Sequence, residues 1–136
     1  LGQRLILPAG ESVFEYSALV RFPDELDAED LSASQTPIEE LPAEVLPFLL
    51  PSRYCQSDVL SRDAWQLFGQ SPVGWGRVQA ICDYVHGHLT FGYQHARHTK
   101  TAWEAFQEGT GVCRDYAHLA IAFCRLPSWF QACANW

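Results

Sequence analysis

Residues 109–125 read GTGVCRDYAHLAIAFCR, and this stretch decides the fold expected for the rest of the chain. Two glycines and a cysteine stand directly before a run that is apolar at nearly every position beyond its first turn. A helix that is apolar nearly all round is typical of the centre of a domain. The pattern therefore predicts a central, buried helix over residues 113–125, with Cys113 at the start of its first turn.

The predicted position of Cys113 is that of a reactive cysteine. Unpaired backbone N–H groups and the helix dipole favour an anion at a helix start, so both stabilise a thiolate, the nucleophilic form of cysteine. Gly109 and Gly111 would shape the turn and let a substrate backbone approach, and the free N–H groups can donate to a developing oxyanion. These features favour nucleophilic acyl transfer by Cys113. The alternative is a small buried hydrophobe, as most cysteines are.

The remaining cysteines are interpreted as structural, and they are Cys55, Cys82, Cys124 and Cys133. The total of five is odd and no C-x-x-C pair occurs, so the pattern does not indicate a secreted disulfide framework and favours a cytoplasmic setting. On one continuous helix, Cys113 and Cys124 would lie about 16 Å apart along the axis, too far for a disulfide.

Composition excludes several classes of partner. The chain has 136 residues, 48% of them hydrophobic, which is enough for one globular domain or pieces of two. The formal net charge is −7 and no basic patch occurs, so we expect neither nucleic acid nor a membrane surface as a partner. No apolar run approaches the about 20 residues that span a bilayer. We expect no cofactor and no metal.

Periodicity divides the chain into three parts. Residues 12–22 alternate between apolar and polar side chains, which predicts a half-buried strand, and residues 3–8 predict another. We therefore interpret residues 1–35 as the end of a β-rich domain that begins upstream. Residues 36–60 are a proline-rich connector that packs on a neighbouring surface, and residues 61–136 are the helical part of a core. The predicted fold class is α+β.

Three more helices are predicted before the cysteine turn. The first covers residues 61–69, with Ser61 as its N-cap and Gly69 just beyond its end. The last covers residues 101–109, with Thr101 and Glu104 at capping-box spacing. The middle one covers residues 74–89, and its predicted face consists of Trp75, Val78, Cys82, Val85 and Leu89.

Residues 101–125 resemble the nucleophile segment of the bacterial transglutaminase-like superfamily, which has a papain-like core. The family pattern G-V-C-x-D-[YFH]-A-H-L is present as residues 111–119, and the likeness covers about residues 60–126, with LPSRYCQSD at 50–58 as a further match. The resemblance implies that Cys113 is the nucleophile of a protease, amidase or transglutaminase. Its expected partner is a protein or peptide amide.

The resemblance also implies that part of the site is absent. In the family, the catalytic histidine and the acid that orients it follow the cysteine helix, on strands of a sheet. Here no histidine follows His118, and residues 126–136 match the family's next strand poorly. We therefore expect a truncated core without amide turnover, or a non-catalytic fragment or binding module. The uncovered helix would then expose apolar surface and favour self-association through Phe123, Trp129, Phe130 and Trp136.

Upstream histidines leave two further alternatives open. His95 and His98 lie in one loop and are candidates for a general base, although a solvated loop is the simpler interpretation. His118 lies about 140° around the helix from Cys113 and should face elsewhere. A zinc-binding module is a third alternative to an enzyme, with four candidate ligands. These are Cys82, His86, His95 and His98.

Overall fold

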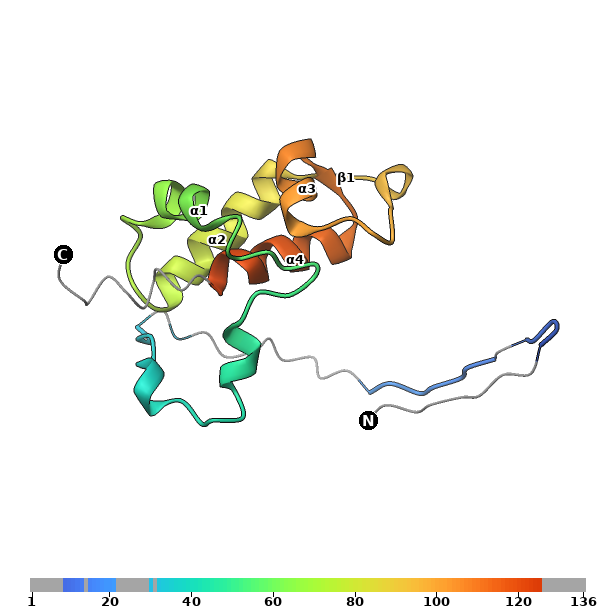
Figure 1. Cartoon of the computed structure of the whole chain (residues 1–136), viewed down its shortest axis with the longest axis horizontal. Helices are drawn as coiled ribbons and strands as arrows, with labels where there is room; N and C mark the ends of the chain where they lie inside the picture. Colours follow the sequence, from blue (N-terminus) through green and yellow to red (C-terminus); the bar gives the residue numbers. More distant parts are fainter. Residues whose placement is uncertain (1–8, 14, 22–29, 31, 126–136) are drawn as a thin grey trace.

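The computed structural model describes residues 9–13, 15–21, 30 and 32–125. Within these residues, four α-helices pack together and a very short parallel sheet lies at one end of them, beside α3, so the predicted α+β class is confirmed (Figure 1). The helices are α1 (Ser61–Phe68), α2 (Trp75–His88), α3 (Ala102–Glu108) and α4 (Cys113–Cys124). The strands are β1 (Thr90–Phe91) and β2 (Thr110–Gly111), and the 3-10 helices are η1 (Ile38–Glu40), η2 (Leu46–Leu49) and η3 (Tyr93–His95).

The core forms where α4 packs against α2 and α3, with α1 against α2 (Figure 1). Phe123 of α4 is 0% exposed, and its ring lies 5.3 Å from that of Phe68 and 5.7 Å from that of Phe106. Truncating a buried phenylalanine to alanine costs about 3–5 kcal/mol. The prediction that Phe123 exposes apolar surface is therefore wrong, while Trp129, Phe130 and Trp136 lie outside the described residues.

Helix α4 has a clear division between its two faces, which corrects the prediction of a helix buried nearly all round. Its buried side chains are Asp115, Leu119, Ala122 and Phe123. The accessible ones are Cys113, Ala117, Ile121 and Cys124. Steps of four, four and three residues place the accessible set along one side of the helix. That side is made mostly of small side chains, and at its end Cys124 lines a pocket together with residues 33–36 and α2.

Helix α2 buries the predicted face only in part. Val85 and Leu89 are buried as predicted, whereas Val78 and Cys82 are exposed and Ile81 is buried instead. A polar contact joins the end of the helix to α3, since the His88 Nε2 atom lies 2.7 Å from the Phe106 carbonyl oxygen. Both sides of α2 carry apolar residues, so their spacing alone could not decide which side faces the core.

The helix ends confirm two predictions and correct one. In α3, Thr101 accepts from the Glu104 N–H and the Glu104 carboxylate accepts from Thr101, which is the predicted capping box. Gly69 directly follows the last residue of α1, as predicted, with a right-handed φ of −58°. Ser61 is the first residue of α1 rather than its N-cap, and its hydroxyl donates to the Asp58 carbonyl at 2.9 Å.

The N-terminal segment departs from the predicted β structure. All described residues between 9 and 21 are exposed and none is in a strand, so the strand predicted over residues 12–22 is wrong for them. A strand needs a partner, and the described part of the chain offers none to this segment. The strand predicted at residues 3–8 lies outside the described residues, and the predicted domain boundaries stay predictions.

The connector packs down on the helices, as predicted, since the Ala102 N–H donates to the Tyr54 carbonyl at 2.8 Å and the Tyr54 ring stacks on His118. The segment just before the connector is held as well, because the Trp75 N–H donates to the Ala33 carbonyl at 3.0 Å. Gly74 makes this contact feasible, because its φ is +84° and a Cβ there would lie 2.3 Å from the Ala33 oxygen. Within the described residues, none of the helices combines the length and the hydropathy that a membrane span requires.

Candidate active site

Cys113 is the first residue of α4, and it is exposed. Val112 before it is extended, with φ −113° and ψ 175°, and is buried. The predicted placement of the thiol at a helix N-terminus is therefore confirmed. At this position the first backbone N–H groups of the helix have no acceptors inside the helix.

The turn that leads into Cys113 is held by β1 from one side. The Thr90 N–H donates to the Gly109 carbonyl at 2.8 Å, and the Gly92 N–H donates to the Gly111 carbonyl at 3.0 Å. Gly109 ends α3 with a φ of +62°, a left-handed conformation that favours glycine. Tyr116, one turn into α4, adds a tether because its hydroxyl donates to the Leu89 carbonyl.

Asp115 holds the same turn from the side of α4. Its carboxylate is 1% exposed and its Oδ2 atom accepts from the Val112 N–H at 2.9 Å. A Cβ at Gly111 would lie 2.7 Å from the Asp115 Cβ and 3.1 Å from Oδ2. Gly111 therefore makes room for this carboxylate, whereas the sequence interpretation gave that space to a substrate backbone. Arg114 lies 3.5 Å from the other carboxylate oxygen of Asp115.

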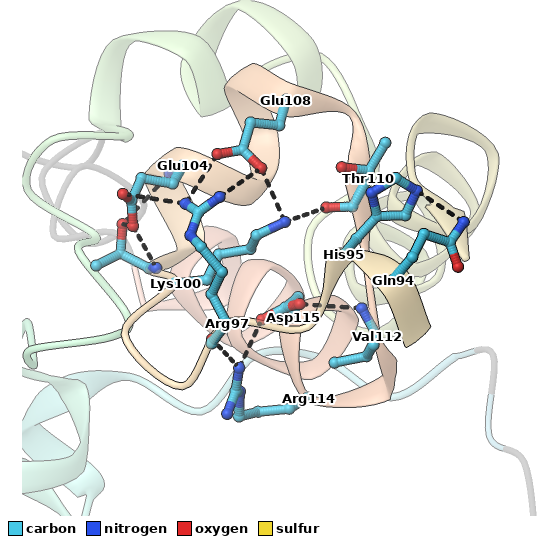
Figure 2. Close-up of polar contacts among 11 residues, drawn as sticks. Gln94, His95, Arg97, Lys100, Glu104, Glu108, Thr110, Val112, Arg114 and Asp115 are labelled. Carbon is cyan, nitrogen blue, oxygen red and sulfur yellow. Dashed lines mark hydrogen bonds and ion pairs between the residues drawn. The ribbon is translucent and has the colours of Figure 1, made fainter. Parts of the chain in front are cut away.

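A third group of contacts comes from the loop at residues 92–100 and was not predicted (Figure 2). Lys100 is 0% exposed, and its Nζ atom lies 2.8 Å from Glu108 Oε2 and donates to the Thr110 carbonyl at 3.1 Å. Arg97 forms ion pairs with Glu104 at 3.2 Å and with Glu108 at 2.9 Å. The loop is therefore pinned to α3 and β2 at once.

The charged groups of this loop and of α3 shift the pKa values of one another. The hydrogen bonds from Arg97 and then Lys100 hold the pKa of Glu108 below its usual value. The Glu108 carboxylate in turn raises the pKa of Arg97. For Glu104, the hydrogen bond from the Thr101 backbone N–H is the largest cause of a lowered pKa. All of these shifts favour the charged forms that make the contacts.

The structure does not join any described histidine to the thiol by a hydrogen bond. His118 stacks on Tyr54 with ring centroids 5.5 Å apart, and its buried Nδ1 atom has no hydrogen-bond partner among the described residues. Burial, and then the charge of Arg114, lower the pKa of His118. The His95 ring lies 3.2 Å from the Gln94 amide nitrogen, and His98 is exposed. The prediction that His118 serves in packing fits its stacked position.

The zinc alternative finds no ligand set. Among the described residues, no three His, Cys, Asp or Glu side chains come together as a metal site. Cys82, which was interpreted as a small core residue or a zinc ligand, is exposed on α2. His86 is exposed on the same helix, and His95 contacts Gln94 instead.

Comparisons with known proteins agree with this arrangement. Residues 66–127 match the transglutaminase-like superfamily. The crystal structure of a proposed cysteine protease from Cytophaga hutchinsonii is 38% identical and superposes with a TM-score of 0.65. The match covers 68% of this chain and 32% of that one, so the chain spans about a third of that protein's length. A search of curated proteins finds no match. The turn, Cys113 and α4 lie inside the matched residues, and this part of the chain belongs to the transglutaminase-like superfamily.

Proposed function

We propose that Cys113 is the nucleophile of an acyl-transfer site that acts on amide bonds of proteins or peptides. The observation that carries this proposal is the exposed thiol at the first residue of α4, behind a turn whose backbone is anchored on several sides. A helix start stabilises the thiolate. The family adds support, since the C. hutchinsonii protein of similar fold is a proposed cysteine protease.

The reaction begins when the Cys113 thiolate attacks the carbonyl carbon of the amide. The new S–C bond pushes the carbonyl electrons onto oxygen, and the N–H groups in the first turn of α4 donate to that oxyanion. The C–N bond then breaks and the amine leaves with a proton, which gives a thioester on Cys113. Water or an amine attacks the thioester and restores the thiol.

We further propose that the present chain completes only the first half of this chemistry with good leaving groups. A departing amine needs a proton, and a positioned general acid contributes about 10²- to 10⁴-fold. No described histidine is bonded to Cys113, and His118 is engaged with Tyr54. An activated ester needs no such acid, because its leaving group is a stable anion. A non-catalytic binding module is the second candidate, and the lack of a histidine at the thiol favours it.

The test compares an activated ester with an amide. The chain and its Cys113→Ser variant would be incubated with p-nitrophenyl acetate and, separately, with a peptide p-nitroanilide, with the C. hutchinsonii protein as the positive control. We expect stoichiometric acetylation at Cys113, abolished in the variant, and no anilide turnover. Added imidazole, as an external acid, should then raise anilide turnover only when Cys113 is present.

Two results would contradict the proposal in different ways. If Cys113 were acetylated no faster than the exposed Cys82, Cys113 would not be an activated nucleophile, and the binding module would be favoured. Anilide turnover near that of the positive control would show that a histidine of this chain acts as the acid, and His95, His98 and His118 would be replaced in turn.

A further inference from the structure

Lys100 is a fully buried lysine beside the nucleophile turn, and the mechanism above does not use it. Its side chain is 0% exposed, although it lies in a loop whose neighbours Arg97, His98 and Thr99 are exposed. Burying an ammonium group is unfavourable unless it is paired and hydrogen-bonded. Lys100 meets both conditions, through Glu108 at 2.8 Å and the Thr110 carbonyl at 3.1 Å (Figure 2).

The bond to Thr110 completes the edge of β2. Along a strand, successive carbonyls point to opposite sides. The Gly109 and Gly111 carbonyls both accept from β1, so the Thr110 carbonyl between them points the other way. A third strand would normally satisfy such an edge, and here the Lys100 ammonium takes that place. The peptide that follows Thr110 is therefore held from both sides, two residues before Cys113.

We propose that Lys100 is a positioning residue for the reaction of Cys113. It fixes the Thr110–Gly111 peptide, and through Val112 it fixes the direction of the first N–H groups of α4 toward the oxyanion. This inference rests on the proposed function, because it assigns Lys100 a role in the oxyanion site. It does not depend on which amide the site accepts.

The neighbouring charges supply a matched control. Arg97 pairs with the same Glu108 and with Glu104, so it shares the ion-pair network. Its side chain bonds to Glu104 and Glu108 rather than to the turn, and Arg114 donates to its backbone carbonyl. Replacing the Arg97 side chain therefore weakens the network and leaves both the Thr110 bond and the Arg114 contact available. Lys100 is the member of the network that touches the turn.

The experiment uses two reactions of Cys113 that differ in one requirement. Alkylation by iodoacetamide needs a thiolate but no oxyanion, whereas acetylation by p-nitrophenyl acetate passes through an oxyanion. Both rates would be measured at Cys113 by peptide mass spectrometry for the parent chain, Lys100→Met and Arg97→Met, below each melting temperature. The ratio of acetylation to alkylation reports the geometry of the N–H donors and cancels changes in thiolate fraction.

We expect Lys100→Met to lower this ratio about tenfold, since a displacement of 1 Å or less costs up to about 100-fold, and Arg97→Met to change it less than about twofold. A ratio that falls equally in both variants, or in neither, overturns the assignment. If Lys100→Met does not fold, Lys100→Gln decides. Glutamine keeps a polar group in the site but is too short to replace the bond to Thr110, so a fall of about tenfold in the ratio supports the assignment and an unchanged ratio overturns it.

The parent chain separates this inference from the proposed function. If its ratio does not exceed that of the same chain unfolded in urea, no oxyanion site exists and both proposals fail. If its ratio is raised and Lys100→Met retains it, the site exists and only the role of Lys100 is wrong.

Discussion

The two ends of α4 carry a cysteine on the same side of the helix, and they surround that thiol differently. At the start, Cys113 is exposed and follows a turn held by β1, Asp115 and Lys100. At the end, Cys124 keeps part of its surface exposed but lines a cavity of about 340 Å³ between residues 33–41 and α2. Partial burial in this cavity, and then the nearby Cys82, raise the pKa of Cys124 to about 11.

The comparison shows that the side chain and the helix face do not decide what a thiol can do. At the start of the helix, free N–H groups and the dipole favour the anion. At the end, the last carbonyls are the unpaired groups and apolar walls disfavour charge. The anchored turn therefore makes the difference, and the predictions below disturb first that turn, then the two thiols, then the helix between them.

The largest effect is expected from Gly111→Ala. The added Cβ would lie 2.7 Å from the Asp115 Cβ, and Asp115 cannot withdraw without losing its bond to Val112. Crowding of this kind costs about 1–3 kcal/mol, and we expect the upper end of that range. Urea unfolding would measure the loss of stability.

Gly87→Ala is the matched control for that change. Gly87 lies inside α2, and a Cβ there meets nothing within 4 Å. Alanine should raise the stability by about 0.5–1 kcal/mol, because glycine is unfavourable inside a helix. If both alanine variants are more stable than the parent, the turn can adapt and is not the rigid element described above.

The next effect concerns the rates at which the two thiols react. The rise in the pKa of Cys124 from 9.0 to about 11 lowers its thiolate fraction at pH 7 about 100-fold. A more basic thiolate is about 10-fold more nucleophilic over that interval, so a net factor of about 10 remains. We expect iodoacetamide to alkylate Cys113 about 10 times faster than Cys124, as followed by mass spectrometry. Equal alkylation rates would show that the two ends of α4 do not differ in how they stabilise a thiolate.

The start of α4 and the whole of α3 could be predicted because their signals are local. Thr101 and Glu104 cap the first turn of α3, Gly109 ends that helix, and Cys113 follows four residues later. The buried role of Lys100 could not be predicted, since its partners belong to α3 and β2 and appear only once these pack. From its sequence position alone, a lysine that precedes a capping box is expected to be exposed.

Errors arose where a pattern depends on a partner. In α2 apolar residues lie on both sides of the helix, so the spacing identified Val85 and Leu89 as buried but chose Cys82 where the packed helices bury Ile81. The alternation over residues 12–22 needs a neighbouring strand, and the described residues hold none for it. The space beside Gly111 was assigned to substrate because a sequence does not show where the Asp115 carboxylate lies.

The smallest effect concerns His118, midway along α4. Burial and Arg114 lower its pKa, while Asp115 opposes the shift only in part. The unfolded chain therefore binds this proton at a higher pH than the folded one. The contribution of His118 to stability is complete above about pH 6.5, the usual value of a histidine, and is lost as the pH falls below it.

Replacing His118 with phenylalanine keeps an aromatic ring against Tyr54 and removes the titration. Between pH 7 and pH 5, the variant should lose less stability than the parent, by about 0.5 kcal/mol or less, because water screens a group this accessible. Urea unfolding at several pH values would show this as a shallower slope, with His98→Asn at the exposed His98 as the control. A slope that is unchanged in His118→Phe, or equally reduced in His98→Asn, would mean that the surroundings of His118 do not favour its neutral form. The middle of α4 would then tolerate a charged side chain, as the start of the helix does, rather than disfavour it, as the end does.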